Sequence, residues 1–220
     1  CTAALLRAAT PELRVVHISS LAARHPALSD YAASKRAGEQ CVMSALPAPR
    51  RVVLRPPAVY GPGDRELRPL LDAMLRGLAL IPGGRDARFS LLHVNDLAGA
   101  VTSLLRGDAG WGQIHEPDDG RPGGYRWSDV ANAVARLRGG PVRSLRLPGL
   151  LLSTLGAGNE CWSRLTRRQP MLTRGKAREL RWLDWVAAGN ASLAATRWRP
   201  VTDLDTGLRE TLAPVPANAS

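Results

Sequence analysis

The segment RVVHISSLAARHPALSDYAASKRAGEQCVMSALPAPRRVVLR, residues 14–55, contains the pattern from which we predict the fold class. It opens and closes with short runs rich in β-branched residues, 14–19 and 51–55, which are typical of parallel strands buried on both faces. Between these runs the apolar residues follow the period of a helix. Alternating strand, helix and strand build a doubly wound parallel sheet, so we predict an α/β fold that contains part of such a sheet.

The helix predicted between the two strands begins at Asp30, which we expect to be its N-cap, and ends before Pro47. Small residues recur along it at helical spacing, and we expect them to share one face: Ala33, Ala37, Cys41 and Ala45. A further helix is expected upstream, at residues 3–9.

Downstream, prolines and glycines between residues 56 and 63 mark a long loop. After it the periodicity predicts a series of shorter elements. In order, we expect a helix near 67–76, a strand near 90–94, a helix at 95–105, a strand near 113–116, a helix at 128–137, a strand at 142–147, a helix at about 150–165, and short helices around Gly175 and Leu204.

The composition is that of an ordinary globular chain, with 220 residues, 45% of them hydrophobic. This length allows one core, or one domain with a smaller one attached. The net charge of +11 comes mainly from arginine, because Lys35 and Lys176 are the only lysines. The arginines are scattered along the sequence, whereas a nucleic-acid interface gathers its basic residues on one face. We therefore expect no specific nucleic-acid partner.

The three cysteines, Cys1, Cys41 and Cys161, are odd in number and lack the spacing of metal ligands. They indicate a reducing compartment, and we expect a cytoplasmic protein without a metal site. No uninterrupted apolar window approaches eighteen residues, so we also expect no membrane span.

Tyr31 and Lys35 lie four residues apart at the start of the predicted helix, a spacing that stacks two side chains on one face. A phenol has a pKa of about 10 in water, which is too high for a general base at neutral pH. A cation held beside a phenol favours the phenolate, and the pair can then exchange a proton with a carbonyl or an alcohol. The alternative is that both residues belong to an ordinary solvated helix face.

Ser20 follows the first predicted strand, and ligands of open α/β sheets bind outside the carboxyl ends of the strands. The helix that carries Tyr31 starts from the same edge. The Ser20 hydroxyl could therefore meet the same substrate oxygen as the Tyr31 phenol. The alternative for Ser20 is a serine that caps a turn.

Four motifs follow one another in an order that resembles the extended short-chain dehydrogenase/reductase superfamily, the group of NAD-dependent epimerases and dehydratases that includes 3β-hydroxysteroid dehydrogenase-like enzymes. The motifs are Ser-Ser-Leu-Ala at 19–22, Asp-Tyr-Ala-Ala-Ser-Lys-Arg-Ala-Gly-Glu at 30–39, Leu-Arg-Pro-Pro-Ala-Val-Tyr-Gly-Pro-Gly-Asp at 54–64 and Leu-His-Val-Asn-Asp-Leu-Ala at 92–98. The resemblance implies a Rossmann-type sheet, NAD or NADP as cofactor, a hydroxyl- or carbonyl-bearing substrate and hydride transfer.

Carried onto this sequence, the resemblance implies that Tyr31 is the catalytic acid/base. Lys35 would assist it and bind the nicotinamide ribose, and Ser20 would bind the reacting oxygen. Tyr31 and Lys35 thus also count as cofactor-binding residues, and the loop residues that would line the nicotinamide are Pro57, Ala58 and Val59. Residues 1–60, joined by 88–107, would belong to the dinucleotide-binding domain, and residues 61–87 and 108–220 to a smaller α+β substrate-binding region. The resemblance also implies a homodimer.

Two departures from the family limit what the resemblance implies. Many members that act on nucleotide sugars carry a diphosphate-binding arginine just before the strand near 90–94, where this chain has Phe89. This departure weakens the expectation of a nucleotide sugar and leaves open a lipid-like, a steroid-like or another small hydroxyl or carbonyl substrate. His93, Asn95 and Asp96 lie at the junction that follows, and helix capping and packing account for them.

The other departure is the lack of a glycine-rich turn between a strand and a helix, which in the family binds the dinucleotide phosphates. We therefore expect that the βα units carrying this turn precede residue 1, and that residues 1–220 alone bind the cofactor poorly and are inactive. The alternative to an enzyme is a non-catalytic relative that keeps the scaffold as a binding or assembly subunit.

Overall fold

The computed structural model describes residues 2–7, 10, 12–82, 84, 86–147 and 173–214. It has the predicted α/β architecture. Three parallel strands form the main sheet in the order β1 (Val15–Ile18), β2 (Arg51–Leu54) and β7 (Ile114–His115). Val15 is in register with Arg51, and Val53 with Ile114.

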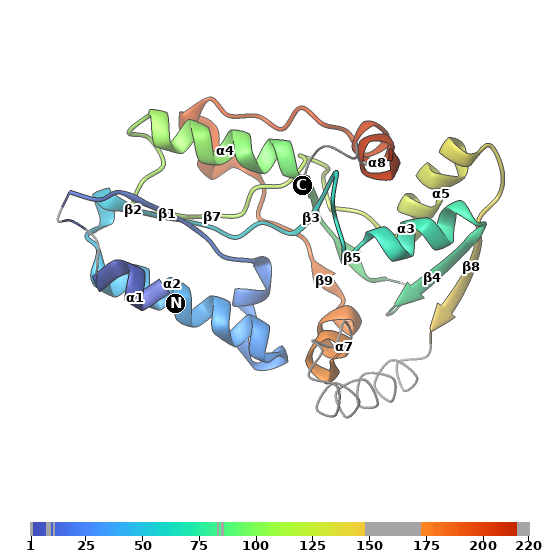
Figure 1. Ribbon diagram of the computed structural model, residues 1–220, viewed down its shortest axis with the longest axis horizontal. Coiled ribbons are helices and arrows are strands. Elements are labelled where there is room, and N and C mark those ends of the chain that lie inside the picture. The colour runs from blue at the N-terminus through green and yellow to red at the C-terminus, as the bar shows by residue number, and fades with distance from the viewer. Residues whose placement is uncertain are drawn as a thin grey trace.

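Helices lie on both sides of this sheet (Figure 1). On one side are α1 (Thr2–Arg7) and α2 (Asp30–Ala45), and on the other is α4 (Val94–Arg106). Residues of β2 and α4 share a core cluster that includes Val52, Leu54, Leu97, Ala100 and Leu104. Burial between the helices explains the continuous apolar run Val52, Val53 and Leu54 of β2.

A second core cluster lies beyond the main sheet, among α3 (Arg68–Leu75), α5 (Trp127–Arg138) and α8 (Leu204–Leu212). Three two-stranded parallel pairs adjoin it. They are β3 (Ala58–Tyr60) with β6 (Leu91–His93), β4 (Leu78–Pro82) with β8 (Arg143–Leu147), and β5 (Arg88–Phe89) with β9 (Asp184–Trp185). Another helix of the described residues, α7 (Arg174–Arg181), lies below β9 in Figure 1.

Short 3-10 turns connect these elements. They are η1 (Leu21–Arg24), η2 (Pro26–Leu28), η3 (Ala48–Arg50) and η4 (Asn190–Thr196). The first two occupy the segment between β1 and α2. The predicted helix at about 150–165 lies outside the described residues, as do Cys1 and Cys161.

One expectation about α2 was wrong. The N-cap is Ser29, whose side chain accepts a hydrogen bond from the Ala32 amide, and Asp30 is already the first helical residue. The buried face carries Ala32, Gly38, Glu39 and Val42, whereas Ala33, Ala37 and Ala45 are exposed and Cys41 is half-buried.

The strand at 114–115 pairs with β2 and so belongs to the main sheet, although we assigned residues 108–220 to the second region. The division into a cofactor-binding and a substrate-binding region stays a prediction. Within the described part of the chain, none of the helices combines the length and hydrophobicity needed to cross a bilayer. The same residues contain no group of three or more His, Cys, Asp or Glu side chains placed to hold a metal ion.

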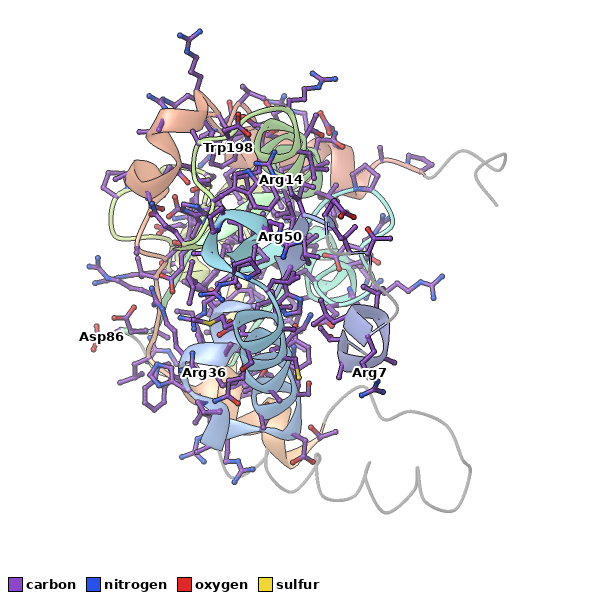
Figure 2. All side chains as sticks on the ribbon, turned by 90° about the vertical axis from the view of Figure 1, so that its left-hand side faces the viewer. Arg7, Arg14, Arg36, Arg50, Asp86 and Trp198 are labelled. Atoms are coloured by element: carbon purple, nitrogen blue, oxygen red, sulfur yellow. The ribbon has the colours of Figure 1, made fainter. Side chains whose placement is uncertain are left out.

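The labelled arginines Arg7, Arg14, Arg36 and Arg50 are spread over the end of the molecule that faces the viewer in Figure 2. Two of them have partners of their own. Arg14 stacks 3.9 Å from the centre of the Trp111 ring and pairs with Asp108 at 3.1 Å, and Arg36 pairs with Glu39.

Candidate active site

Ser20 lies at the carboxyl edge of the main sheet, directly after β1. The parallel pairing continues past the strand, because the Ser19 amide donates to Leu54 O at 2.7 Å. The Ser20 oxygen accepts a hydrogen bond from the Ala22 amide at 3.2 Å and so caps η1. This bond uses a lone pair and leaves the hydroxyl proton for another acceptor. Ser20 is therefore a cap, and it also keeps a donor for a ligand.

Tyr31 and Lys35 lie side by side on the first two turns of α2. The Lys35 ammonium is 5.6 Å from the centre of the Tyr31 ring, as the four-residue spacing predicts. Its Nζ donates to the backbone oxygen of Ile18, the last residue of β1, at 3.4 Å. Half of the Tyr31 surface is exposed to solvent. The pair thus faces solvent at the strand end from which Ser20 follows.

The loop after β2 returns to the same edge. The Leu21 amide, next to Ser20, donates to Pro56 O at 3.0 Å. Pro57 follows, half-buried, and then come Ala58, exposed, and Val59, half-buried, at the start of β3. The backbone therefore brings the predicted nicotinamide-lining segment next to the turn that carries Ser20.

A buried ion pair, which we did not predict from the sequence, lies beneath this edge. Glu39 on α2 is fully buried and accepts hydrogen bonds from Arg55 Nε and NH2, both at 2.7 Å. The Ser19 hydroxyl donates to the same carboxylate at 2.6 Å. Burial alone would raise the pKa of Glu39, but these hydrogen bonds outweigh it and hold the pKa below its usual value. The signal in the sequence was an arginine placed directly after a buried strand.

The pair extends across the sheet through Glu116, which follows β7. Arg55 NH1 is 3.5 Å from Glu116 Oε1, and Arg24 Nε of η1 donates to the same oxygen at 2.8 Å. Glu116 also accepts from the Ala188 amide at 3.1 Å. Burial acts to raise the pKa of Glu116, and the Arg24 bond and charge reverse this shift and lower it. The network connects α2, η1 and the carboxyl ends of β2 and β7.

The remaining candidates have structural roles or lie apart. The buried Asp96 carboxylate accepts from the backbone amides of Val201 and Thr202, both at 3.1 Å. Phe89 is buried in the second core cluster, 4.7 Å from the Trp127 ring between ring centres. Arg88 donates to Gly123 O at 3.4 Å. Arg85 lies outside the described residues. No described cation therefore occupies the position of the diphosphate-binding arginine.

Part of the sequence also matches a known protein family. Residues 6–114 match the sequence pattern that defines the "NAD dependent epimerase/dehydratase family". This part of the chain is therefore similar to that family. The stretch begins in α1 and ends in β7, so it contains Ser20, Tyr31, Lys35 and the segment 57–59.

Two curated proteins are similar to this chain in sequence. The chain is 40% identical to a ceramide reductase from Caulobacter vibrioides over 172 residues, which are 78% of this chain and 53% of that protein. It is 30% identical over 98 residues to a mitochondrial NADH dehydrogenase 1 alpha subcomplex subunit 9 from Arabidopsis thaliana, which covers 44% of this chain and 24% of that protein. The chain thus spans about half the length of the first relative and a quarter of the second.

Among solved structures, MoeE5 in complex with UDP-glucose and NAD aligns with a TM-score of 0.66 at 20% identity. The alignment covers 96% of this chain and 68% of MoeE5. At this identity the likeness shows the fold alone, and it agrees with part of a Rossmann-type sheet.

Proposed function

We propose that this chain carries the proton-transfer residues of an NAD(P)-dependent oxidoreductase or epimerase that acts at a hydroxyl- or carbonyl-bearing carbon. The observation that supports this proposal is the adjacency of Tyr31 and Lys35 at the end of β1 from which Ser20 follows. A solvated helix face accounts for Tyr31 and Lys35, but it does not account for a second hydroxyl, that of Ser20, at the same strand end.

The exposed groups fit a nicotinamide ribose. Lys35 has three donors and spends one on Ile18 O through a long bond, so the others can reach ribose hydroxyls. Ala58 and Val59 offer a small apolar surface for a nicotinamide ring. The bound cofactor would supply or accept the hydride. The sequence has no glycine-rich turn for the dinucleotide phosphates, so residues outside this chain would hold that part.

The chain's own residues would manage the proton. In reduction, the Tyr31 hydroxyl donates its proton to the carbonyl oxygen while the carbon receives the hydride, and the product is an alcohol. The Lys35 ammonium stabilises the phenolate left on Tyr31, which then regains a proton from solvent. The Ser20 hydroxyl donates to the same substrate oxygen and fixes its position. In oxidation every step runs in reverse.

Two observations, the name of one relative and the position of Phe89, support a proposal for the class of substrate. The Caulobacter relative is named a ceramide reductase, and its match covers 78% of this chain. Phe89 has an uncharged side chain and is buried in the core, so it cannot bind a diphosphate as an arginine would. Both observations favour a lipid-like carbonyl compound over a nucleotide sugar.

The test uses the protein at its full native length. NADH and NADPH serve as separate hydride donors to a short-chain oxo-ceramide, and NAD⁺ and NADP⁺ serve as separate hydride acceptors from UDP-glucose. We expect the Tyr31→Phe variant to bind the cofactor and to lose turnover by about 10²- to 10⁴-fold. Tyr60→Phe, which changes a tyrosine in the other core cluster, is the matched control and should keep full activity. Equal activity of wild type and Tyr31→Phe would refute the proposed role of Tyr31.

One observation favours a second candidate, a non-catalytic subunit. The Arabidopsis relative is named as a subunit of NADH dehydrogenase, and it is 30% identical to this chain over 98 residues. A full-length protein that binds NAD(P)H but turns over no carbonyl compound, and that co-purifies in a larger complex, would support this candidate instead.

A further inference from the structure

The helix α7 packs directly on the first turn of α2, although about 150 residues separate them in sequence (Figure 1). The hydroxyl of Ser29, the N-cap of α2, donates a hydrogen bond to Glu179 of α7. The contact is close, because a Cβ on Gly175 would lie 2.7 Å from the Ser29 Cβ. Tyr31 follows Ser29 by two residues, so α7 lies beside the turn of α2 that carries the proposed acid/base.

Lys176 lies on α7 three residues before Glu179, so both side chains lie on the same side of the helix. The Lys176 ammonium binds Glu66, in the loop between β3 and α3, at 2.9 Å. The Lys176 side chain is 39% exposed and the Glu66 side chain 78%. The Lys176 ammonium on α7 is therefore bound by the Glu66 carboxylate, which is mostly exposed to solvent.

The charge environment also connects Lys176 with Tyr31. Burial acts to lower the pKa of Lys176, but the hydrogen bond and charge of Glu66, with the charges of Glu179 and Tyr31, outweigh it and raise the pKa. The lysine therefore stays protonated and can donate to an oxygen of another group.

The Lys176–Glu66 pair is poorly suited to hold the fold together. Pairs with so exposed a partner contribute little stability, about 0.2–1 kcal/mol. The same weakness makes the ammonium easy to release to a ligand that competes with Glu66. By contrast, Glu179 and Gly175 already anchor α7 on α2 without Lys176.

We propose that Lys176 is a substrate-binding residue: its ammonium leaves Glu66 and donates a hydrogen bond to a substrate oxygen near the carbon on which Tyr31 acts. This inference rests on the proposed function. The shared chemistry is an oxygen acceptor, which is the amide oxygen in an N-acyl lipid and a diphosphate oxygen in a nucleotide sugar. Lys176 would supply the cation that the chain lacks at Phe89.

The experiment measures binding of a short-chain oxo-ceramide and of UDP-glucose to the full-length protein by calorimetry. Oxo-ceramide binding is measured in the presence of NAD⁺, which has no hydride to give, and UDP-glucose binding in the presence of NADH, which cannot accept one. Neither ligand can then react. The variants are Lys176→Met and Glu66→Gln. Their matched controls are Arg178→Met, an exposed cation on the same helix, and Glu12→Gln, an exposed carboxylate elsewhere.

We expect Lys176→Met to weaken binding of one of the two ligands by about tenfold, because a hydrogen bond to a charged group is lost. Glu66→Gln should strengthen binding of the same ligand by about two- to fivefold, because it removes the competing carboxylate. The two controls should stay near the wild-type affinity. The ligand that responds identifies the acceptor as an amide or a diphosphate oxygen.

A merely structural ion pair would give a different result, because Lys176→Met and Glu66→Gln would then change binding in the same direction. That outcome overturns the inference, and so does unchanged binding in Lys176→Met or a wild type that binds neither ligand. The proposed function fails separately: if Tyr31→Phe keeps its turnover while the opposite effects at Lys176 and Glu66 persist, the role of Tyr31 is wrong and that of Lys176 stands.

Discussion

Glu39 on α2 and Arg55 at the end of β2 form a two-pronged ion pair, with both hydrogen bonds at 2.7 Å and the carboxylate fully buried. Planar pairs of this kind fix orientation as well as distance. The pair therefore sets how α2, which carries Tyr31 and Lys35, sits on the strand that leads to Pro57.

Removing the charge of Glu39 should destabilise the protein. Glu39→Gln leaves Arg55 with weaker acceptors in a buried place, and we expect a loss of about 3 kcal/mol in the free energy of unfolding. Denaturant unfolding at neutral pH measures it. Glu12→Gln, at an exposed carboxylate, is the control and should stay within about 0.5 kcal/mol of wild type.

The same pair should make stability depend on acid pH. Because the pKa of Glu39 is lowered in the folded state, its stabilising contribution is complete above its unfolded value of 4.5 and is lost as the pH falls through the lower folded value. The stability difference between wild type and Glu39→Gln should therefore shrink below about pH 4.5. A stability difference that stays constant down to about pH 3, which is below the usual pKa range of carboxyl groups, would contradict this cause.

Ser20 and Ser29 provide a comparison between a proposed catalytic serine and a structural one. Ser20→Ala should reduce turnover of the full-length protein by about tenfold or more with little change in stability, because the substrate oxygen loses a donor. Ser29→Ala removes the cap of α2 and the bond to Glu179, and it should cost about 1–2 kcal/mol of stability. Kinetics and thermal unfolding of both variants separate the two roles. The opposite pattern would assign Ser20 to the fold alone.

Replacing Lys35 should affect the cofactor as well as the chemistry. Lys35→Met removes the ammonium beside Tyr31, and we expect weaker NAD(P)H binding together with a fall in turnover of about 10²-fold or more. Fluorescence titration and single-turnover kinetics measure the two effects. Arg36→Met removes a neighbouring cation that pairs with Glu39, so it should change stability more than cofactor binding.

Gly207 of α8 lies against Tyr60, and a Cβ there would be 2.4 Å from the Tyr60 hydroxyl oxygen. We expect Gly207→Ala to lower stability by about 1–3 kcal/mol, although alanine suits a helix better by about 1 kcal/mol. The Tyr60 hydroxyl has no hydrogen-bond partner among the described residues, so Tyr60→Phe alone should be nearly neutral. Combining the two should restore part of the loss, as thermal unfolding would show. No rescue would mean that the ring, and not its hydroxyl, blocks the alanine.

Local pattern was enough to predict the elements around the candidate site. Strands at 14–19 and 51–55 and the helix between them follow from β-branched runs and helical period, and the structure has them within about two residues. The proximity of Tyr31 and Lys35 also follows from sequence, because four residues along a helix bring two side chains to one face. The functional roles of these residues stay proposals.

Other features arise only when the chain folds. Glu39 is buried because Arg55 arrives from a different element to neutralise it, and no periodicity within α2 signals that partner. Lys176 meets Glu66 across 110 residues, and Glu179 meets Ser29 across 150. Sequence alone determined the local elements and the pairing within one helix, since these depend on backbone geometry over a few residues. The tertiary structure decided which charges are buried and which helix stands beside Tyr31, since both depend on how distant segments pack.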